Sequence, residues 1–152
     1  MNDHAKNDEN KYTRPRPRNF MMRPDEQPPF AELMGMKITH MSPDRVTAEL
    51  VVTEALTNRN HVLHGGAVMA LADNLGGTAA VANLQPGTST ATIESKTNFF
   101  ASIAVGDTAY AECTPLHRGR TTTVWQTRIT RGDGKLAAIV TQTQIVLTKP
   151  GG

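Results

Sequence analysis

The sequence has few of the features that mark special classes of protein. Its 152 residues include one cysteine, Cys113, so no disulfide can form within the chain. Aromatic residues make up 5% of the chain. No apolar run is long enough to span a membrane, and the N-terminus lacks the apolar segment of a signal peptide. A net charge of +2 does not indicate nucleic-acid binding. We therefore expect a cytoplasmic protein with neither a membrane nor a nucleic acid among its partners.

Proline is scarce outside the first part of the chain. Residues 1–29 are polar and contain Pro15, Pro17, Pro24, Pro28 and Pro29. This composition predicts a flexible polar leader in residues 1–29 and a folded domain in residues 30–152. Residues 30–34 can form a short helical turn that a glycine at position 35 ends.

The rest of the chain has the hydrophobic pattern of strands around one helix. Residues 36–40 alternate, with Met36, Ile38 and His40 on one face, and residues 46–52 alternate in the same way. A Ser-Pro-Asp turn signal separates these two strands, which we expect to form a hairpin. Residues 66–82 are almost entirely apolar and predict a helix that is buried on most sides.

The second half of the chain contains strand patterns with turn signals between them. Because no alternating strand–helix pattern is present, we do not expect a doubly wound parallel sheet. We expect an α+β fold in which a six-stranded antiparallel sheet wraps around one central apolar helix. Cys113 and Trp125 fall in strand patterns, and we interpret both as core residues. The four predicted strands are residues 89–100, 108–116, 121–130 and 136–147.

The predicted helix begins at His64-Gly65-Gly66. The first N–H groups of a helix have no partner within it, and they carry partial positive charge. Glycines let a ligand approach this backbone closely, so the segment could form an oxyanion hole. The alternative is that the two glycines only permit a tight turn into the helix.

Asp73 lies in the middle of the same apolar helix. A buried carboxylate needs hydrogen-bond partners or a raised pKa, which makes Asp73 a candidate catalytic group. The alternative is a structural aspartate bonded to Asn74 or to a neighbouring strand. Gly76 and Gly77 follow, and since glycine is unfavourable inside a helix, they indicate that another helix or a ligand packs very close there.

The spacing of Gly65 and Asp73 bears on how the two could act together. Eight residues separate them, which is about 12 Å along a helix. A carboxylate at that distance can hardly serve a carbonyl bound at Gly65 of its own chain. If both act in one reaction, two antiparallel helices related by a two-fold axis would bring Asp73 of one chain to Gly65 of the other.

Three segments of the sequence resemble a known family. Residues 58–66 (Asn-Arg-Asn-His-Val-Leu-His-Gly-Gly) with the later Asp-Asn pair at 73–74, residues 92–100, and residues 117–120 (His-Arg-Gly-Arg) are similar to hot-dog-fold thioesterases. The resemblance spans about residues 30–147 and is strongest to the PaaI-like (phenylacetic acid degradation) group of the 4-hydroxybenzoyl-CoA thioesterase superfamily. It implies hydrolysis of an aryl- or medium-chain acyl-CoA, no metal, and no cofactor beyond the CoA of the substrate. It also implies a homodimer, or a tetramer built from two dimers, with active sites at the subunit interface.

The resemblance implies roles for particular residues. Asp73 would be the nucleophile or the general base, and the Gly65 N–H would polarise the thioester carbonyl. His64 and Asn58 would position the thioester or the water, and Thr92 would assist the attacking water. The positions that match the CoA-binding surface are Gly66, Asn74, Phe99, Phe100, His117, Arg118, Gly119, Arg120 and Thr121.

Two other functions use the same residues. A non-catalytic acyl-CoA-binding or regulatory module would need no carboxylate, whereas Asp73 is present. A hydratase or dehydratase acting on acyl thioesters could use His64 and Asp73 for proton transfer. The spacing of Asn58, the His-Gly-Gly segment and Asp73 fits the hydrolases better.

Overall fold

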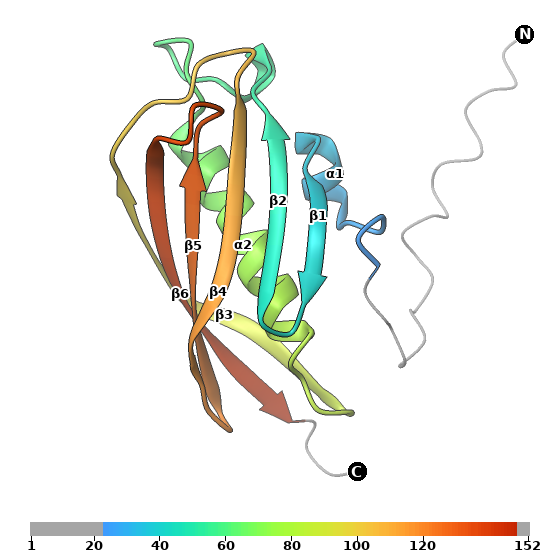
Figure 1. Ribbon diagram of the computed structural model, residues 1–152. Helices are drawn as coiled ribbons and strands as arrows, with labels where there is room; N and C mark the ends of the chain where they lie inside the picture. The colour runs from blue at the N-terminus through green and yellow to red at the C-terminus, as the bar shows by residue number, and fades with distance from the viewer. Residues whose placement is uncertain (1–22, 149–152) are drawn as a thin grey trace, which may run out of the picture.

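The computed structural model describes residues 23–148, which form a curved antiparallel sheet around a long helix (Figure 1). The six strands lie in the order β1-β2-β4-β5-β6-β3, so β1 and β3 are the edges. The expected α+β class and its six-stranded sheet are confirmed. In chain order the elements are α1 (Pro29–Met34), β1 (Lys37–Ser42), β2 (Arg45–Val51), the 3-10 helix η1 (Glu54–Leu56), α2 (Gly65–Val81), β3 (Thr88–Phe99), β4 (Thr108–Arg118), β5 (Thr122–Thr130) and β6 (Leu136–Thr148).

The core lies between α2 and the concave face of the sheet (Figure 1). Leu71 and Leu75 of α2 are fully buried, as are Trp125 and Ile129 of β5. Cys113 on β4 is also buried, and burial raises the pKa of its thiol to about 11. The interpretation of Cys113 and Trp125 as core residues is confirmed. No helix in residues 23–148 is long and apolar enough to cross a membrane.

The first strand departs from its predicted alternation. Ile38 pairs with Ala48 and His40 pairs with Thr47, so Thr39 is an extra residue in β1. This bulge reverses the direction of the side chains that follow. The prediction that His40 shares the face of Ile38 is therefore wrong: His40 is exposed, and Met41 packs against the core instead.

Part of the expected leader packs against the domain. Gln27 is buried, its Nε2 donates to the Pro24 carbonyl, and its Oε1 accepts a hydrogen bond from Asn74 of α2 at 2.9 Å. The short helix predicted at residues 30–34 begins one residue earlier, with Gly35 at its end in the left-handed region (φ 77°). Residues 1–22 of the expected leader lie outside the described residues.

Candidate active site

The N-terminus of α2 presents one open backbone donor. His64 caps the helix, because its Nδ1 accepts the Gly66 N–H at 2.8 Å and its carbonyl accepts the N–H groups of Ala67 and Val68. Within residues 23–148, the Gly65 N–H has no acceptor. Gly65 is thus the glycine that can donate to a substrate oxygen, whereas the Gly66 N–H that the sequence also offered is occupied by His64.

Aromatic and polar side chains surround this donor. A cleft of about 420 Å³ is lined by Gly65, Asn58, Phe99 and Phe100, four of the residues predicted for the site. The Phe99 ring lies so close that a Cβ at Gly65 would be 3.3 Å from Cζ. Asn58 and His64 also line a neighbouring cleft. The Asn58 Oδ1 accepts the Asn60 N–H at 2.8 Å, which leaves the Nδ2 of that amide for a ligand.

The Asp73 carboxylate lies two turns further along α2. Its Oδ1 accepts the Thr92 hydroxyl at 3.0 Å and the Gln142 Nε2 at 2.7 Å. Its Oδ2 has no hydrogen-bond partner among the described residues, and the side chain is exposed in the single chain. Asp73, Thr92 and Gln144 line a cleft of about 410 Å³. One oxygen of the carboxylate is therefore fixed and the other is available for chemistry.

A bulge in β3 sets the direction of Thr92. Thr92 pairs with Gln144 of β6, and Glu94 pairs with the next residue of β6, so Ile93 is an extra residue. Side chains seven residues apart on a regular strand point to opposite faces. Because of the bulge, Thr92 and Phe99 share the inner face, where Thr92 contacts Asp73 and Phe99 covers Gly65.

Two glutamines of β6 complete this polar cluster, and the sequence reading missed both. Gln142 and Gln144 are each 1% exposed. Gln144 Nε2 donates to the Thr92 hydroxyl oxygen at 2.8 Å, which leaves the Thr92 proton for Asp73. The sequence does contain a signal that these glutamines face inward: positions 138, 140, 142 and 144 share one face of the strand, and the first two are the apolar Ala138 and Val140.

The adjacent glycines Gly76 and Gly77 of α2 have different surroundings. A Cβ at Gly76 would overlap Gln142 Oε1 and lie 2.9 Å from Gln142 Cδ. A Cβ at Gly77 would meet nothing within 4 Å in the described part of the chain. The close packing expected at this pair occurs at Gly76, but within the described residues its partner is the Gln142 side chain of β6 and not another helix or a ligand.

Asn74 turns away from Asp73. Its Nδ2 donates to Gln27 Oε1 at 2.9 Å and contacts the Met36 sulfur at 3.1 Å. Asn74 still lines the cleft beside Asp73, but its amide holds the segment before α1 in place. Of the two kinds of partner expected for a structural Asp73, Asn74 is not found, whereas neighbouring strands are: the hydrogen bonds come from Thr92 on β3 and Gln142 on β6.

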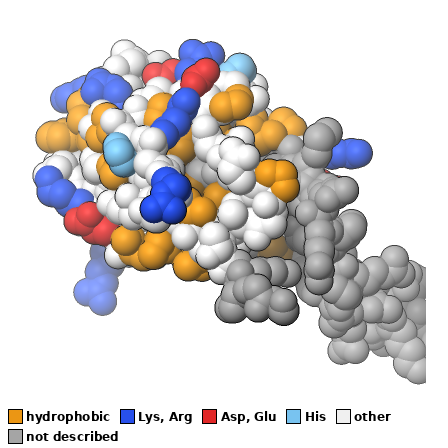
Figure 2. Space-filling model, turned by 90° about the horizontal axis from the view of Figure 1, so that it is seen from below, with side chains coloured by type: hydrophobic (Ala, Val, Ile, Leu, Met, Phe, Trp, Pro, Cys, Tyr) orange, Lys and Arg blue, Asp and Glu red, His pale blue; other side chains and the backbone are white. Residues whose placement is uncertain are grey.

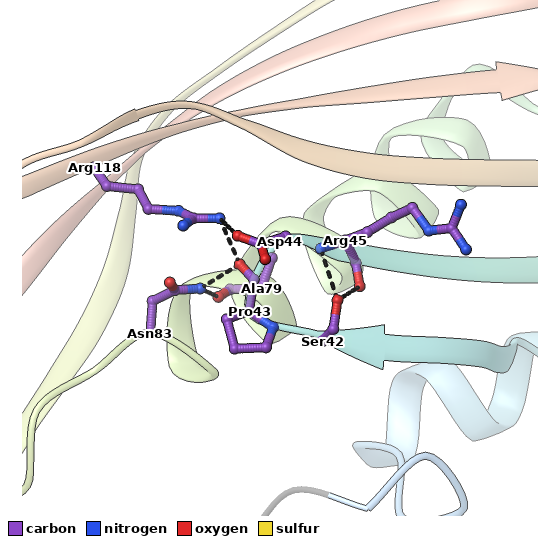
Figure 3. Close-up of polar contacts among 7 residues, drawn as sticks. All are labelled: Ser42, Pro43, Asp44, Arg45, Ala79, Asn83 and Arg118. Atoms are coloured by element: carbon purple, nitrogen blue, oxygen red, sulfur yellow. Dashed lines mark hydrogen bonds and ion pairs between the residues drawn. The ribbon is translucent and has the colours of Figure 1, made fainter.

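The segment 117–121 lies at the other end of α2. Arg118 donates to the Asp44 carboxylate at 2.7 Å and to the Pro43 carbonyl at 2.8 Å, and Asn83 donates to the same carbonyl (Figure 3). Its guanidinium also stacks over Trp125, 5.7 Å from the ring centroid. Arg118, predicted to contact CoA, thus fastens the β1–β2 turn to the end of β4.

The neighbours of Arg118 form a tight turn with exposed side chains. The Gly119 N–H donates to the Thr122 carbonyl at 2.8 Å, and a Cβ at Gly119 would lie 2.6 Å from His117 Nε2. His117, Arg120 and Thr121 are exposed, and Arg120 lines a cleft of about 370 Å³. This end of the molecule shows more basic than acidic side chains, set among hydrophobic ones (Figure 2).

The predicted site residues therefore form separate groups within residues 23–148. One surrounds the Gly65 N–H, one surrounds Asp73, and one lies at the turn that contains Gly119. No group of three or more His, Cys, Asp or Glu side chains in the described part of the chain could hold a metal ion. The arrangement offers a carboxylate oxygen, which can act as a nucleophile or base, and a helix N–H, which can stabilise an oxyanion in acyl transfer.

Known proteins share this arrangement of strands and helix. Residues 60–138 match the family model described as the thioesterase superfamily. The chain is 33% identical over 113 residues to a predicted esterase of Mycobacterium tuberculosis, Rv1847, covering 72% of this chain and 80% of that protein. The solved structure of that protein superposes with a TM-score of 0.76 at 30% identity, and the match covers 82% of this chain and 100% of that one.

Two further relatives carry more specific names. The 1,4-dihydroxy-2-naphthoyl-CoA hydrolase of Listeria monocytogenes is 31% identical over 109 residues, covering 71% of this chain and 87% of that enzyme. The thioesterase HI1161 of Haemophilus influenzae gives a TM-score of 0.74 at 27% identity, covering 78% of this chain and 82% of that one. The fold is thus the hot-dog fold expected from the sequence. The chain belongs to the thioesterase superfamily and is a thioester hydrolase.

Proposed function

We propose that the protein hydrolyses acyl-CoA, with Asp73 as the nucleophile or general base and the Gly65 N–H as the oxyanion donor. The observation that carries this proposal is the Asp73 carboxylate, whose Oδ1 is held by two donors while Oδ2 has no partner among the described residues. A thioester has a good leaving group, so a carboxylate and one oxyanion donor suffice without metal or cofactor.

The reaction consumes one water. The oxygen that attacks the carbonyl carbon comes from Asp73 Oδ2 itself, or from a water whose proton Oδ2 accepts. Negative charge then develops on the carbonyl oxygen, where the Gly65 N–H and the N-terminus of α2 stabilise it. The C–S bond breaks and the CoA thiolate leaves. Where water attacked, the proton taken by Oδ2 passes to the thiolate and the free acid is released. Where Oδ2 attacked, the acyl group stays on Asp73 as a mixed anhydride, which water then hydrolyses to the free acid, restoring the carboxylate and supplying the proton of the thiol.

The two groups act across a two-fold dimer in this proposal. About 12 Å of helix separates Gly65 from Asp73, and each has its own cleft in the chain. The edge strand β3 runs for 12 residues with its outer edge unpaired in residues 23–148, and Ile93 on it is 58% exposed. Met69, on the same exposed face of α2 as Asp73, is 41% exposed. A second copy would cover these surfaces and bring its own Asp73 toward Gly65.

The acyl group is proposed to be aryl or medium-chain. The Listeria relative is named for an aryl-CoA substrate, which supports the aryl class. The cleft beside Asp73, about 410 Å³, has the size of a small-molecule site. Arg120 is proposed to contact a phosphate of CoA at the basic end of the molecule, for which a guanidinium is well suited.

The experiment is a panel of aryl-, short-, medium- and long-chain acyl-CoA substrates, with CoA release followed by a thiol reagent. Asp73→Asn and Asp73→Ala should lose turnover by at least about 100-fold while keeping the fold. Asp133 of the β5–β6 hairpin lines none of the clefts described above, so Asp133→Asn serves as the matched control. Full activity in the Asp73 variants would refute the mechanism, and hydration of crotonyl-CoA without CoA release would favour a hydratase.

A further inference from the structure

Gln142 is a buried polar side chain that ends at the Asp73 carboxylate. It lies on β6, is 1% exposed, and donates from Nε2 to Asp73 Oδ1 at 2.7 Å. An ionised carboxylate can only accept, so the amide must present its N–H side here. With the Thr92 hydroxyl on the same oxygen, donors from two strands hold the carboxylate in one orientation.

The other end of this amide has no partner. The Gln142 Oε1 is buried and makes no hydrogen bond within residues 23–148. A buried oxygen without a partner makes the folded state less stable than an apolar side chain of the same shape would. Stability therefore does not account for a glutamine at position 142, and its contact with Asp73 does.

Gly76 makes room for the same amide. A Cβ at this position would overlap the Gln142 Oε1, as described above. Glycine is unfavourable inside a helix relative to alanine, and the adjacent Gly77 shows no such contact. Gly76 and Gln142 are thus both residues that stability alone would not favour at their positions, and they lie against each other beside Asp73.

We propose that Gln142 is a positioning residue for the reaction: it fixes Asp73 through Oδ1 and leaves Oδ2 for the chemistry, in the space that Gly76 provides. Gln144 supports the other donor, since it sends the Thr92 proton toward Asp73. This assignment rests on the proposed function, in which Asp73 is the catalytic carboxylate.

The first test replaces the amide by an apolar side chain of similar size. Gln142→Leu should lower kcat by about tenfold to a hundredfold, because a carboxylate that is free to rotate is misplaced for attack. The KM should stay within about twofold, since substrate binding is untouched, and the Tm should not fall. Gln126→Leu, a half-buried glutamine on the other face of the sheet, is the matched control and should leave both constants unchanged.

The second test displaces the Gln142 amide by a substitution on α2. Gly76→Ala adds a methyl group that displaces the Gln142 amide, so kcat should fall although the helix gains propensity. In a Gln142→Val background the side chain stops short of Gly76, and Gly76→Ala should then have no further effect on kcat. Such non-additivity is expected of two residues that act through one contact.

Asp73→Asn is measured beside these variants. If Asp73→Asn is inactive while Gln142→Leu keeps the kcat of the parent, the positioning role is wrong and the proposed function stands. If Asp73→Asn keeps its activity, the proposed function is wrong and the role of Gln142 with it. Equal effects of Gly76→Ala with and without Gln142 would also overturn the inference.

Discussion

The proposed oxyanion donor, the Gly65 N–H, can be removed without disturbing the helix that carries it. Gly65 is the first residue of α2, and proline is favoured at the first helical position because the missing N–H has no partner there. The preceding residue, His64, has φ −62° and ψ 136°, the extended conformation that a residue before proline prefers. Gly65→Pro therefore deletes one N–H and keeps the backbone.

The size of the effect follows from how many donors are available. The Gly66 N–H is already bonded to His64, so no second helix donor replaces the one at Gly65. Loss of one oxyanion donor typically lowers kcat by about 100-fold to 1,000-fold, or about 2.7–4 kcal/mol in the activation free energy. Gly65→Pro should show this fall with a Tm within a few degrees of the parent.

The control is Gly65→Ala, which keeps the N–H and adds the same Cβ against the Phe99 ring. Because Phe99 is 55% exposed, its ring can move by the few tenths of an ångström required. The assay is steady-state CoA release on the best substrate of the panel, with thermal unfolding measured in parallel. A Gly65→Pro protein with the kcat of the Gly65→Ala protein would refute the oxyanion role of Gly65.

Further outcomes follow from the same contacts. Inactive Asp73→Asn and Gly65→Pro chains, unfolded and refolded together, should regain about a quarter of the parent activity. Half of the dimers would contain one chain of each kind, and each of these would hold one intact site out of two. No recovery would refute sites shared between chains. Arg118→Ala should lower the Tm through loss of the β1–β2 turn contacts, whereas Arg120→Ala should raise the KM for acyl-CoA severalfold at constant Tm. Cys113 should not react with thiol reagents in the folded protein at pH 8. Its pKa rises from 9.0 in the unfolded chain to about 11 in the folded one, so the free energy of unfolding should fall between pH 9 and pH 11. Cys113→Ala should make this fall smaller.

The fold was predictable because its signals are local. Alternation of apolar residues identified the strands, and a nearly continuous apolar run identified the helix, which was expected at residues 66–82 and is found at Gly65–Val81. The bulges at Thr39 and Ile93 were not predictable in the same way. Each depends on which residue of the partner strand lies opposite, and a single strand does not encode that.

The site was predicted in its parts rather than in its contacts. The residue pattern made Asp73 and the Gly65 N–H candidates, the family resemblance added Thr92, and the structure brings Thr92 to Asp73. Gln142 was not predicted as a site residue, because a polar residue in a strand is by default assigned to the solvent face. The engagement of Arg118 with the β1–β2 turn escaped because the partners are more than 70 residues apart in the chain.

The bulge at Ile93 makes segment length a functional property of this chain. None of the side chains between Thr92 and Phe99 bonds to Asp73 or contacts Gly65, yet their number decides whether both end residues face the helix. Any residue type that fits the strand could replace Ile93, whereas deleting it would send one of the two ends to the outer face. In this segment the number of residues between Thr92 and Phe99 matters more than their identity, so insertions and deletions should lower activity more than substitutions do.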